Sequence, residues 1–145
     1  MLRTGVARWA GSSACGTGKM KNQYTGIMDA FGFEKLRVYQ NARALVRDVY
    51  SLLREYPVEE RYALCDQMRR SAISIPSNIA EGMGRYSVKE QAHFLEIANG
   101  SLMELYCQLG ISKDLCYISE DIYGEMRRKT YELAIMLSKL HELRK

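Results

Sequence analysis

The chain has 145 residues, a hydrophobic fraction of 47% and only 2 prolines, a composition typical of one helical domain with a buried core rather than a disordered chain. No run of 18 apolar residues is present, so the sequence predicts no membrane span. The net charge of +4 is concentrated near the N-terminus: residues 1–32 carry four basic residues and one acidic residue, and the rest of the chain has a net charge of +1. The overall basic charge is therefore weak evidence for nucleic-acid binding.

Residues 1–32 are rich in Gly and show no helical or strand periodicity. We interpret them as a disordered leader, or as upstream sequence if translation naturally starts at Met20 or Met28. An organelle transit peptide is the alternative, since the segment contains Arg and Ser and almost no acidic residue. The segment from Gly11 to Lys19 fails the phosphate-loop motif, because six residues rather than four separate Gly11 from Gly18.

A first helix is predicted from about Phe33 to Tyr56, with Pro57 ending it. Its apolar face consists of Leu36, Tyr39, Ala42, Leu45, Val46, Val49, Leu52, Leu53 and Tyr56. The remaining face is mainly basic, with Lys35, Arg37, Arg43, Arg47 and Arg54. Such a face is either solvated or in contact with phosphate groups, and the sequence leaves both interpretations open.

A second helix is predicted from about Val58 to Met83, with a kink at Pro76 and left-handed glycines, Gly82 and Gly84, at its end. Its apolar stripe consists of Leu64, Met68, Ala72, Ile75, Ile79 and Met83. A polar stripe runs beside it and consists of Gln67, Ser71, Ser74, Asn78 and Glu81. Because buried polar groups need partners, we expect these side chains to form a network that fixes helix register; a ligand or partner site is the alternative.

Two further helices complete an all-α fold, a predicted antiparallel up-down-up-down four-helix bundle over residues 33–145. The third begins with a capping box from Ser87 to Glu90 and ends near Leu115, and we expect Gly100 to mark a close helix contact. Its polar stripe, which is placed to meet that of the second helix, consists of Ser101, Glu104 and Gln108. The fourth starts after Ser119 as cap and contains the basic run 127–129.

Residues able to carry chemistry are few. Glu90 and His93 match half of a di-iron motif, but no second pair exists, so the sequence predicts no metal, no cofactor and no enzymatic activity. The four cysteines form no CxxC pair and no zinc-like spacing with a histidine; they are Cys15, Cys65, Cys107 and Cys116. We expect them to be reduced thiols in the cytoplasm.

The segment Arg69 to Gly82 reads Arg-Arg-Ser-Ala-x-Ser-Ile-Pro-Ser-Asn-Ile-Ala-Glu-Gly. It resembles the signature of four helix bundle proteins encoded in intervening sequences of bacterial large-subunit ribosomal RNA genes, also called S23-type ribosomal proteins. The similarity continues through Phe33-Glu34-x-Leu36, Pro57, Ser87-x-Lys89-Glu90, Ala98-x-Gly100-Ser101 and Glu104. Members of this family have no assigned catalysis. The residues expected to form its structural polar signature are Ser71, Ser74, Asn78, Glu81 and Glu104.

The resemblance also implies assembly. Relatives form five-subunit barrels, and a similar accessory protein of diversity-generating retroelements binds nucleic acid and a reverse transcriptase through a basic surface. We therefore expect a homo-oligomer, a pentamer by resemblance, that binds RNA or a nucleoprotein partner and neither a membrane nor a small-molecule substrate. The candidate nucleic-acid contacts are Arg37, Arg43, Arg47, Arg69 and Arg70.

The alternative is a structural oligomer or a protein-partner adaptor that binds no nucleic acid. The two hypotheses differ in what they require of the basic residues. RNA binding requires the candidate arginines and the run 127–129 to share one surface. Acidic residues interspersed on that surface would favour the adaptor. The acidic residues in question are Glu55, Glu59, Glu60 and Glu125.

Overall fold

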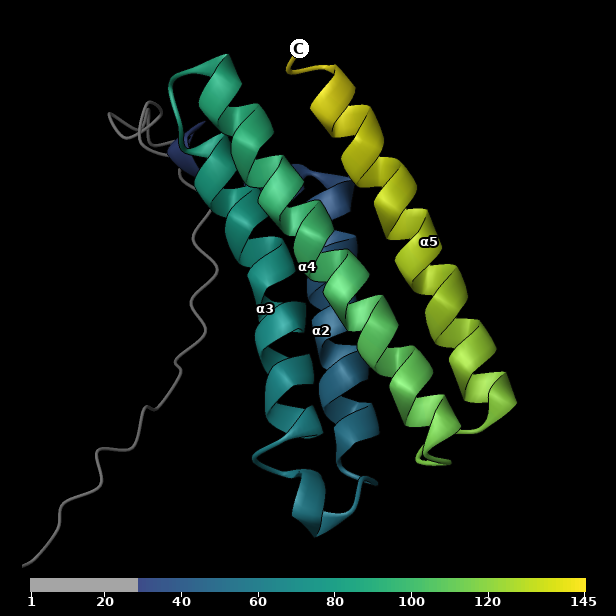
Figure 1. The fold of residues 1–145 in the computed structure, drawn as a ribbon. Helices are drawn as coiled ribbons and strands as arrows, with labels where there is room; N and C mark the ends of the chain where they lie inside the picture. Colours follow the sequence, from purple (N-terminus) through teal and green to yellow (C-terminus); the bar gives the residue numbers. More distant parts are fainter. Residues whose placement is uncertain (1–28) are drawn as a thin grey trace, which may run out of the picture.

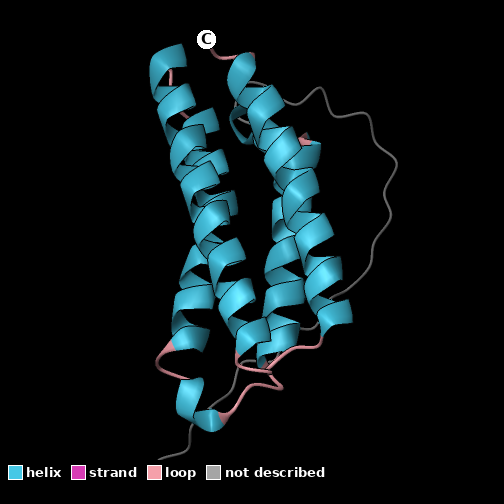
Figure 2. Ribbon diagram, turned by 45° about the vertical axis from the view of Figure 1, so that its right-hand side comes forward, coloured by secondary structure: helices cyan, strands magenta, loops and turns pink. Residues whose placement is uncertain are grey.

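The computed structural model describes residues 29–145, which form helices and no strand, as the all-α prediction requires. Two 3₁₀ helices, η1 (Asp29–Lys35) and η2 (Val58–Glu60), accompany four long α-helices in this part of the chain. The α-helices are α2 (Arg37–Leu53), α3 (Leu64–Met83), α4 (Val88–Asp114) and α5 (Glu120–Glu142) (Figures 1 and 2). Most of the expected leader, residues 1–28, lies outside the described residues, and η1 crosses the expected boundary at residue 33.

The four α-helices lie side by side around one apolar core (Figure 1). α3 packs against α2 and α4, and α5 packs against the same two helices. The buried residues recur at three- and four-residue steps on every helix, which is why each helix presents one continuous apolar face. On α2 these residues are Val38, Ala42, Leu45, Val49 and Leu53. Among residues 29–145, no helix combines the length and the apolar composition that crossing a lipid bilayer requires.

The first two helices are shorter than their apolar patterns predicted. α2 begins only after Leu36, whose extended backbone (φ −71°, ψ 126°) separates it from η1, and it ends at Leu53. Tyr56 nevertheless reaches the core from outside the helix, with its ring 5.4 Å from that of Tyr117. α3 starts at Leu64 rather than Val58, and the Glu60 carboxylate accepts a hydrogen bond from the Leu64 N–H there. Tertiary contacts therefore continue the apolar pattern where the helices have already stopped.

The glycines differ from the sequence-based expectation. α3 is assigned without interruption across Pro76, and its C-cap Gly84 is right-handed (φ −82°), so the predicted left-handed cap is wrong. Gly82 is instead a point of close approach: a Cβ there would lie 2.9 Å from Phe94 Cβ and 3.3 Å from the Gln91 carbonyl oxygen of α4. Gly100 has open space around its Cβ position, so the expected close contact at that residue is absent.

Of the two predicted N-terminal caps, that of α5 forms its hydrogen bond and that of α4 does not. Ser87 occupies the N-cap position of α4, but its side chain makes no capping hydrogen bond, so the capping box does not form. Ser119 caps α5 as predicted, and its hydroxyl accepts a hydrogen bond of 3.2 Å from the Ile122 N–H.

Candidate nucleic-acid interface

An open groove runs between α2 and α3 on the surface of the protein. Arg43 and Arg47 line it from α2, at the four-residue spacing that places both on one side of the helix. The α3 wall is mainly apolar, with Ile73, Pro76, Ser77 and Ala80. The groove has a volume of about 470 Å³, and its lining contains no carboxylate.

Basic residues also gather further along the same two helices, where α2 leads into α3. Arg54, Arg61 and Arg69 line a second hollow of about 330 Å³, together with Tyr56 and Cys65. We call the set Arg43, Arg47, Arg54, Arg61 and Arg69 the arginine groove. Within residues 31–145, whose side chains the structure describes, none of these five guanidinium groups forms an ion pair with a carboxylate. Their positive charge is therefore available to an external anion.

Aromatic rings and a backbone carbonyl position two of these guanidinium groups. Arg43 lies 5.8 Å from the centroid of the Tyr39 ring, and Arg69 lies 6.0 Å from that of Tyr50. An Arg69 Nη1 N–H also donates a 3.4 Å hydrogen bond to the Arg61 carbonyl oxygen. Burial raises the pKa of the neighbouring Cys65 thiol, and the positive charge of Arg69 opposes that rise.

Three of the five candidate arginines lie in this groove, namely Arg43, Arg47 and Arg69. At 100° per residue, Arg37 lies about 120° around α2 from Arg43, so it faces a different side. Arg70 pairs with Asp66 at 3.2 Å and is already partly neutralised. Sequence reasoning missed Arg61, because the predicted second helix extended over it, whereas it lies in the link after η2.

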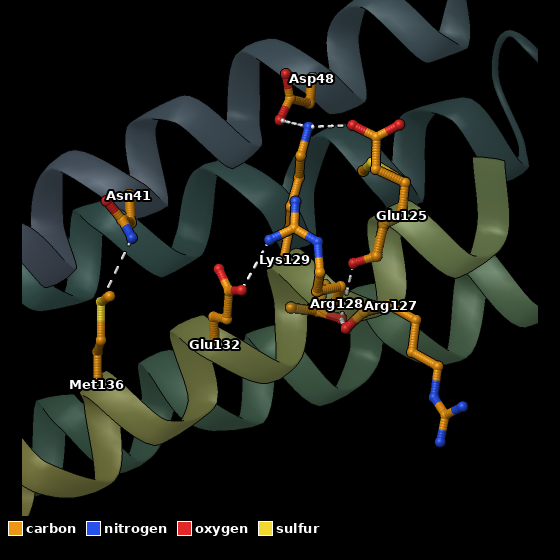
Figure 3. A network of polar contacts seen from close by, with 10 residues as sticks. Asn41, Asp48, Glu125, Arg127, Arg128, Lys129, Glu132 and Met136 are labelled. Atoms are coloured by element: carbon orange, nitrogen blue, oxygen red, sulfur yellow. Dashed lines mark hydrogen bonds and ion pairs between the residues drawn. The ribbon is translucent and has the colours of Figure 1, made fainter. Parts of the chain in front are cut away.

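The basic run 127–129 lies away from the arginine groove, so the shared surface that the RNA hypothesis required does not form in full. Figure 3 shows its surroundings between α2 and α5. Lys129 Nζ lies 2.8 Å from Asp48 Oδ2 and 3.0 Å from Glu125 Oε1, and hydrogen bonding to Asp48 raises its pKa. Arg128 pairs with Glu132 at 2.7 Å. This part of the surface is largely neutralised by its own carboxylates.

Arg127, the remaining member of the run, points away from that network (Figure 3). It lines a hollow of about 250 Å³ between α4 and α5, where its neighbours are largely apolar. They include the exposed side chains of Met103 and Tyr131, which are 46% and 69% accessible to solvent. The apolar lining distinguishes this hollow from the arginine groove.

The polar stripes of α3 and α4 face each other and form a hydrogen-bonded seam. Ser71 Oγ donates to Gln108 Oε1 at 2.7 Å, and the hydroxyls of Ser74 and Ser101 lie 2.7 Å apart. Asn78 Nδ2 donates to the Ser74 carbonyl oxygen at 2.8 Å and lies 2.9 Å from its hydroxyl. The seam lies where α3 packs against α4, and the sequence-based expectation was that the two polar stripes meet between these helices.

The two glutamates of the polar signature have separate surroundings. Glu104 accepts a 3.2 Å hydrogen bond from Gln108 Nε2 and so extends the seam. Glu81 is exposed and pairs with Arg85 at 2.8 Å, one turn further along the chain. Glu81 therefore lies outside the seam.

Metal-ligating side chains do not cluster within residues 31–145. This part of the chain contains no cluster of three or more His, Cys, Asp or Glu side chains able to hold a metal ion. Glu90 and His93 are both exposed near the start of α4. Cys65, Cys107 and Cys116 are free thiols, and the expectation for Cys15 falls outside the described residues.

Comparison with known proteins places this all-helical chain in a family. The family model described as 23S rRNA-intervening sequence protein matches residues 34–139, which include the arginine groove and the α3–α4 seam. Comparison with curated proteins gives no match. Because the family model covers most of the chain, the protein belongs to the family of 23S rRNA-intervening sequence proteins.

Proposed function

We propose that this protein is a non-catalytic, antiparallel four-helix bundle that assembles into a homo-oligomer and binds RNA through the arginine groove. The observation that carries the proposal is the gathering of five unpaired guanidinium groups along α2, the η2 link and α3, in linings without a carboxylate. Guanidinium groups match the planar oxygens of phosphate and suit an RNA backbone. The family name, which refers to ribosomal RNA, agrees with this ligand class.

Binding of this kind is directed at the backbone rather than at the bases. The two tyrosine rings beside the groove, Tyr39 and Tyr50, already lie near the guanidinium groups of Arg43 and Arg69. Bases are usually read by free aromatic faces or by hydrogen bonds to their edges, and phosphate contacts carry no sequence information. We therefore expect weak sequence specificity and strong dependence on salt.

Assembly supplies the charge that one subunit lacks. Residues 33–145 carry 17 basic and 16 acidic residues, so a single folded subunit has little net attraction for a polyanion. A homo-oligomer, which the family resemblance suggests is a pentamer, repeats the arginine groove around its symmetry axis. Several grooves acting on one RNA raise the overall affinity without any new type of contact.

The second candidate function is an adaptor for a protein partner without RNA binding. It is favoured by the neutralised run 127–129 and by the apolar hollow between α4 and α5, where Met103 and Tyr131 are exposed. Apolar side chains around a hollow are a common feature of protein-binding surfaces. This candidate predicts that groove substitutions leave partner binding unchanged.

A charge-matched pair of double variants separates the two functions. Arg43→Glu with Arg47→Glu reverses two groove charges, and Arg127→Glu with Arg128→Glu reverses two charges outside it. Fluorescence anisotropy with RNAs of unrelated sequence should show much weaker binding for the first variant than for the second. Light scattering with and without RNA reports the number of subunits at the same time. Equal loss in both variants would refute the groove, and no RNA binding by the wild-type protein would favour the adaptor.

A further inference from the structure

The hollow at the turn between α2 and α3 gathers positive charge from three separate chain segments. Arg54 follows the last residue of α2, Arg61 lies in the link after η2, and Arg69 lies on the second turn of α3. All three side chains line the same space of about 330 Å³. This volume lies at the lower end of the range for small-ligand sites.

Glu60, a carboxylate of η2, is already engaged elsewhere, and Glu55 and Glu59 form no ion pair with the three arginines. Glu60 Oε1 accepts a 2.9 Å hydrogen bond from the Tyr117 hydroxyl, and Glu60 Oε2 accepts one of 3.3 Å from the Leu64 N–H. Asp66, in the first turn of α3, pairs with Arg70 rather than with an arginine of the hollow. The three guanidinium groups therefore have no carboxylate partner among the described side chains of residues 31–145.

The hollow is also partly preorganised. Arg69 is held by its contact with the Tyr50 ring and by its hydrogen bond to the Arg61 carbonyl oxygen. That hydrogen bond ties the link to α3 next to the hollow. A guanidinium group that is already positioned loses little freedom when an anion binds, which favours a defined site over diffuse attraction.

We propose that Arg54, Arg61 and Arg69 form a binding site for a phosphate group. This proposal rests on the proposed function, because RNA is the natural source of the phosphate. The same chemistry would accept the phosphate of a free nucleotide. The groove around Arg43 and Arg47 is lined by two helices, whereas this smaller hollow is lined by three chain segments and takes one phosphate-bearing group rather than a length of backbone.

Isothermal titration calorimetry of the full chain with inorganic pyrophosphate tests the site directly. Saturable binding is expected, and Arg61→Gln should weaken it about tenfold, because it removes one charge-assisted contact. Arg61 is exposed, so this variant should fold, and Arg54→Gln provides a second exposed position. The matched control is Arg127→Gln, which should bind pyrophosphate as the wild type does. Absent binding, or equal weakening in the control, would overturn the proposal.

Binding experiments with RNA distinguish this site from the proposed function and identify the source of the phosphate. If RNA binds through Arg43 and Arg47 but neither pyrophosphate binding nor an effect of Arg61→Gln is found, the site is refuted and the RNA function stands. If pyrophosphate binds with the expected dependence on Arg61 but RNA does not bind, the site stands and the RNA function is refuted. If RNA with a 5′-phosphate displaces pyrophosphate better than 5′-hydroxyl RNA does, the site binds a terminal phosphate. If the two RNAs displace pyrophosphate equally, the site binds a backbone phosphate. If only a free nucleotide displaces pyrophosphate, the natural ligand is the nucleotide.

Discussion

Replacing Gly82 by Ala tests how closely α3 approaches α4. The added Cβ would lie 2.9 Å from Phe94 Cβ and 3.3 Å from the Gln91 carbonyl oxygen. Neither atom is the end of a flexible side chain, so the two helices must move apart by some tenths of an ångström. Overpacking of this kind costs about 1–3 kcal/mol, and Ala offsets at most about 1 kcal/mol of that through its higher helix propensity. We expect a net loss of about 1–2 kcal/mol in the free energy of unfolding.

Gly100→Ala is the matched control, because it makes the same chemical change on α4 with open space around the new methyl group. It should raise stability by up to about 1 kcal/mol. Thermal unfolding followed by circular dichroism should then give shifts of opposite sign, with Gly82→Ala lower by about 3–6 °C. Both variants must be compared at one protein concentration, because assembly changes apparent stability. A rise in melting temperature for Gly82→Ala would refute the close approach.

Three further substitutions test the polar contacts. Ser71→Ala should cost about 1–3 kcal/mol in urea unfolding, because Gln108 Oε1 loses its buried donor, whereas the exposed Ser77→Ala on the same helix should change little. Glu81→Ala should change stability by less than about 0.5 kcal/mol, since its ion pair is exposed; a larger loss would place Glu81 in a buried contact. Lys129→Met should cost about 0.5–1 kcal/mol near neutral pH. Because the folded-state pKa of Lys129 is raised, the stability difference between wild type and variant should persist up to about pH 10.5 and shrink above it. A stability difference that stays constant above that pH would contradict the ion pairing of Lys129.

The helices and their inward faces were predictable from the sequence because burial repeats with the helical period. Ala42, Leu45 and Val49 are buried as the spacing predicted. The helix ends were not predictable in the same way. Tyr56 continues the apolar pattern of the first helix, yet it reaches the core from beyond the C-terminus of α2. Periodicity reports which residues are buried, and it does not distinguish a helical residue from a turn residue that packs against the same core.

The candidate site was predictable only in part, for a related reason. The four-residue spacing of Arg43 and Arg47 placed them on one side of α2. Only the packing of α2 on α3 brings Arg69 close to Arg54, with which it lines the second hollow. Arg61 was placed inside the predicted second helix, whereas it lies in the link before α3. Lys129 was placed in a basic run by its sequence neighbours, whereas its partner Asp48 comes from a helix more than eighty residues away in the chain. Ion pairing between helices cannot be predicted from local charge patterns.

The central claim is that the arginine groove binds the phosphate backbone of RNA, and the affinity of the wild-type protein for RNA as a function of salt tests it most directly. Fluorescence anisotropy between about 50 and 200 mM salt should show a fall of at least about tenfold, linear in logarithmic coordinates and similar for RNAs of unrelated sequence. The double substitution of Arg43 and Arg47 by Glu should lower both the affinity and the steepness of this dependence. Binding that is insensitive to salt, or no detectable binding at about 50 mM salt, would contradict the claim.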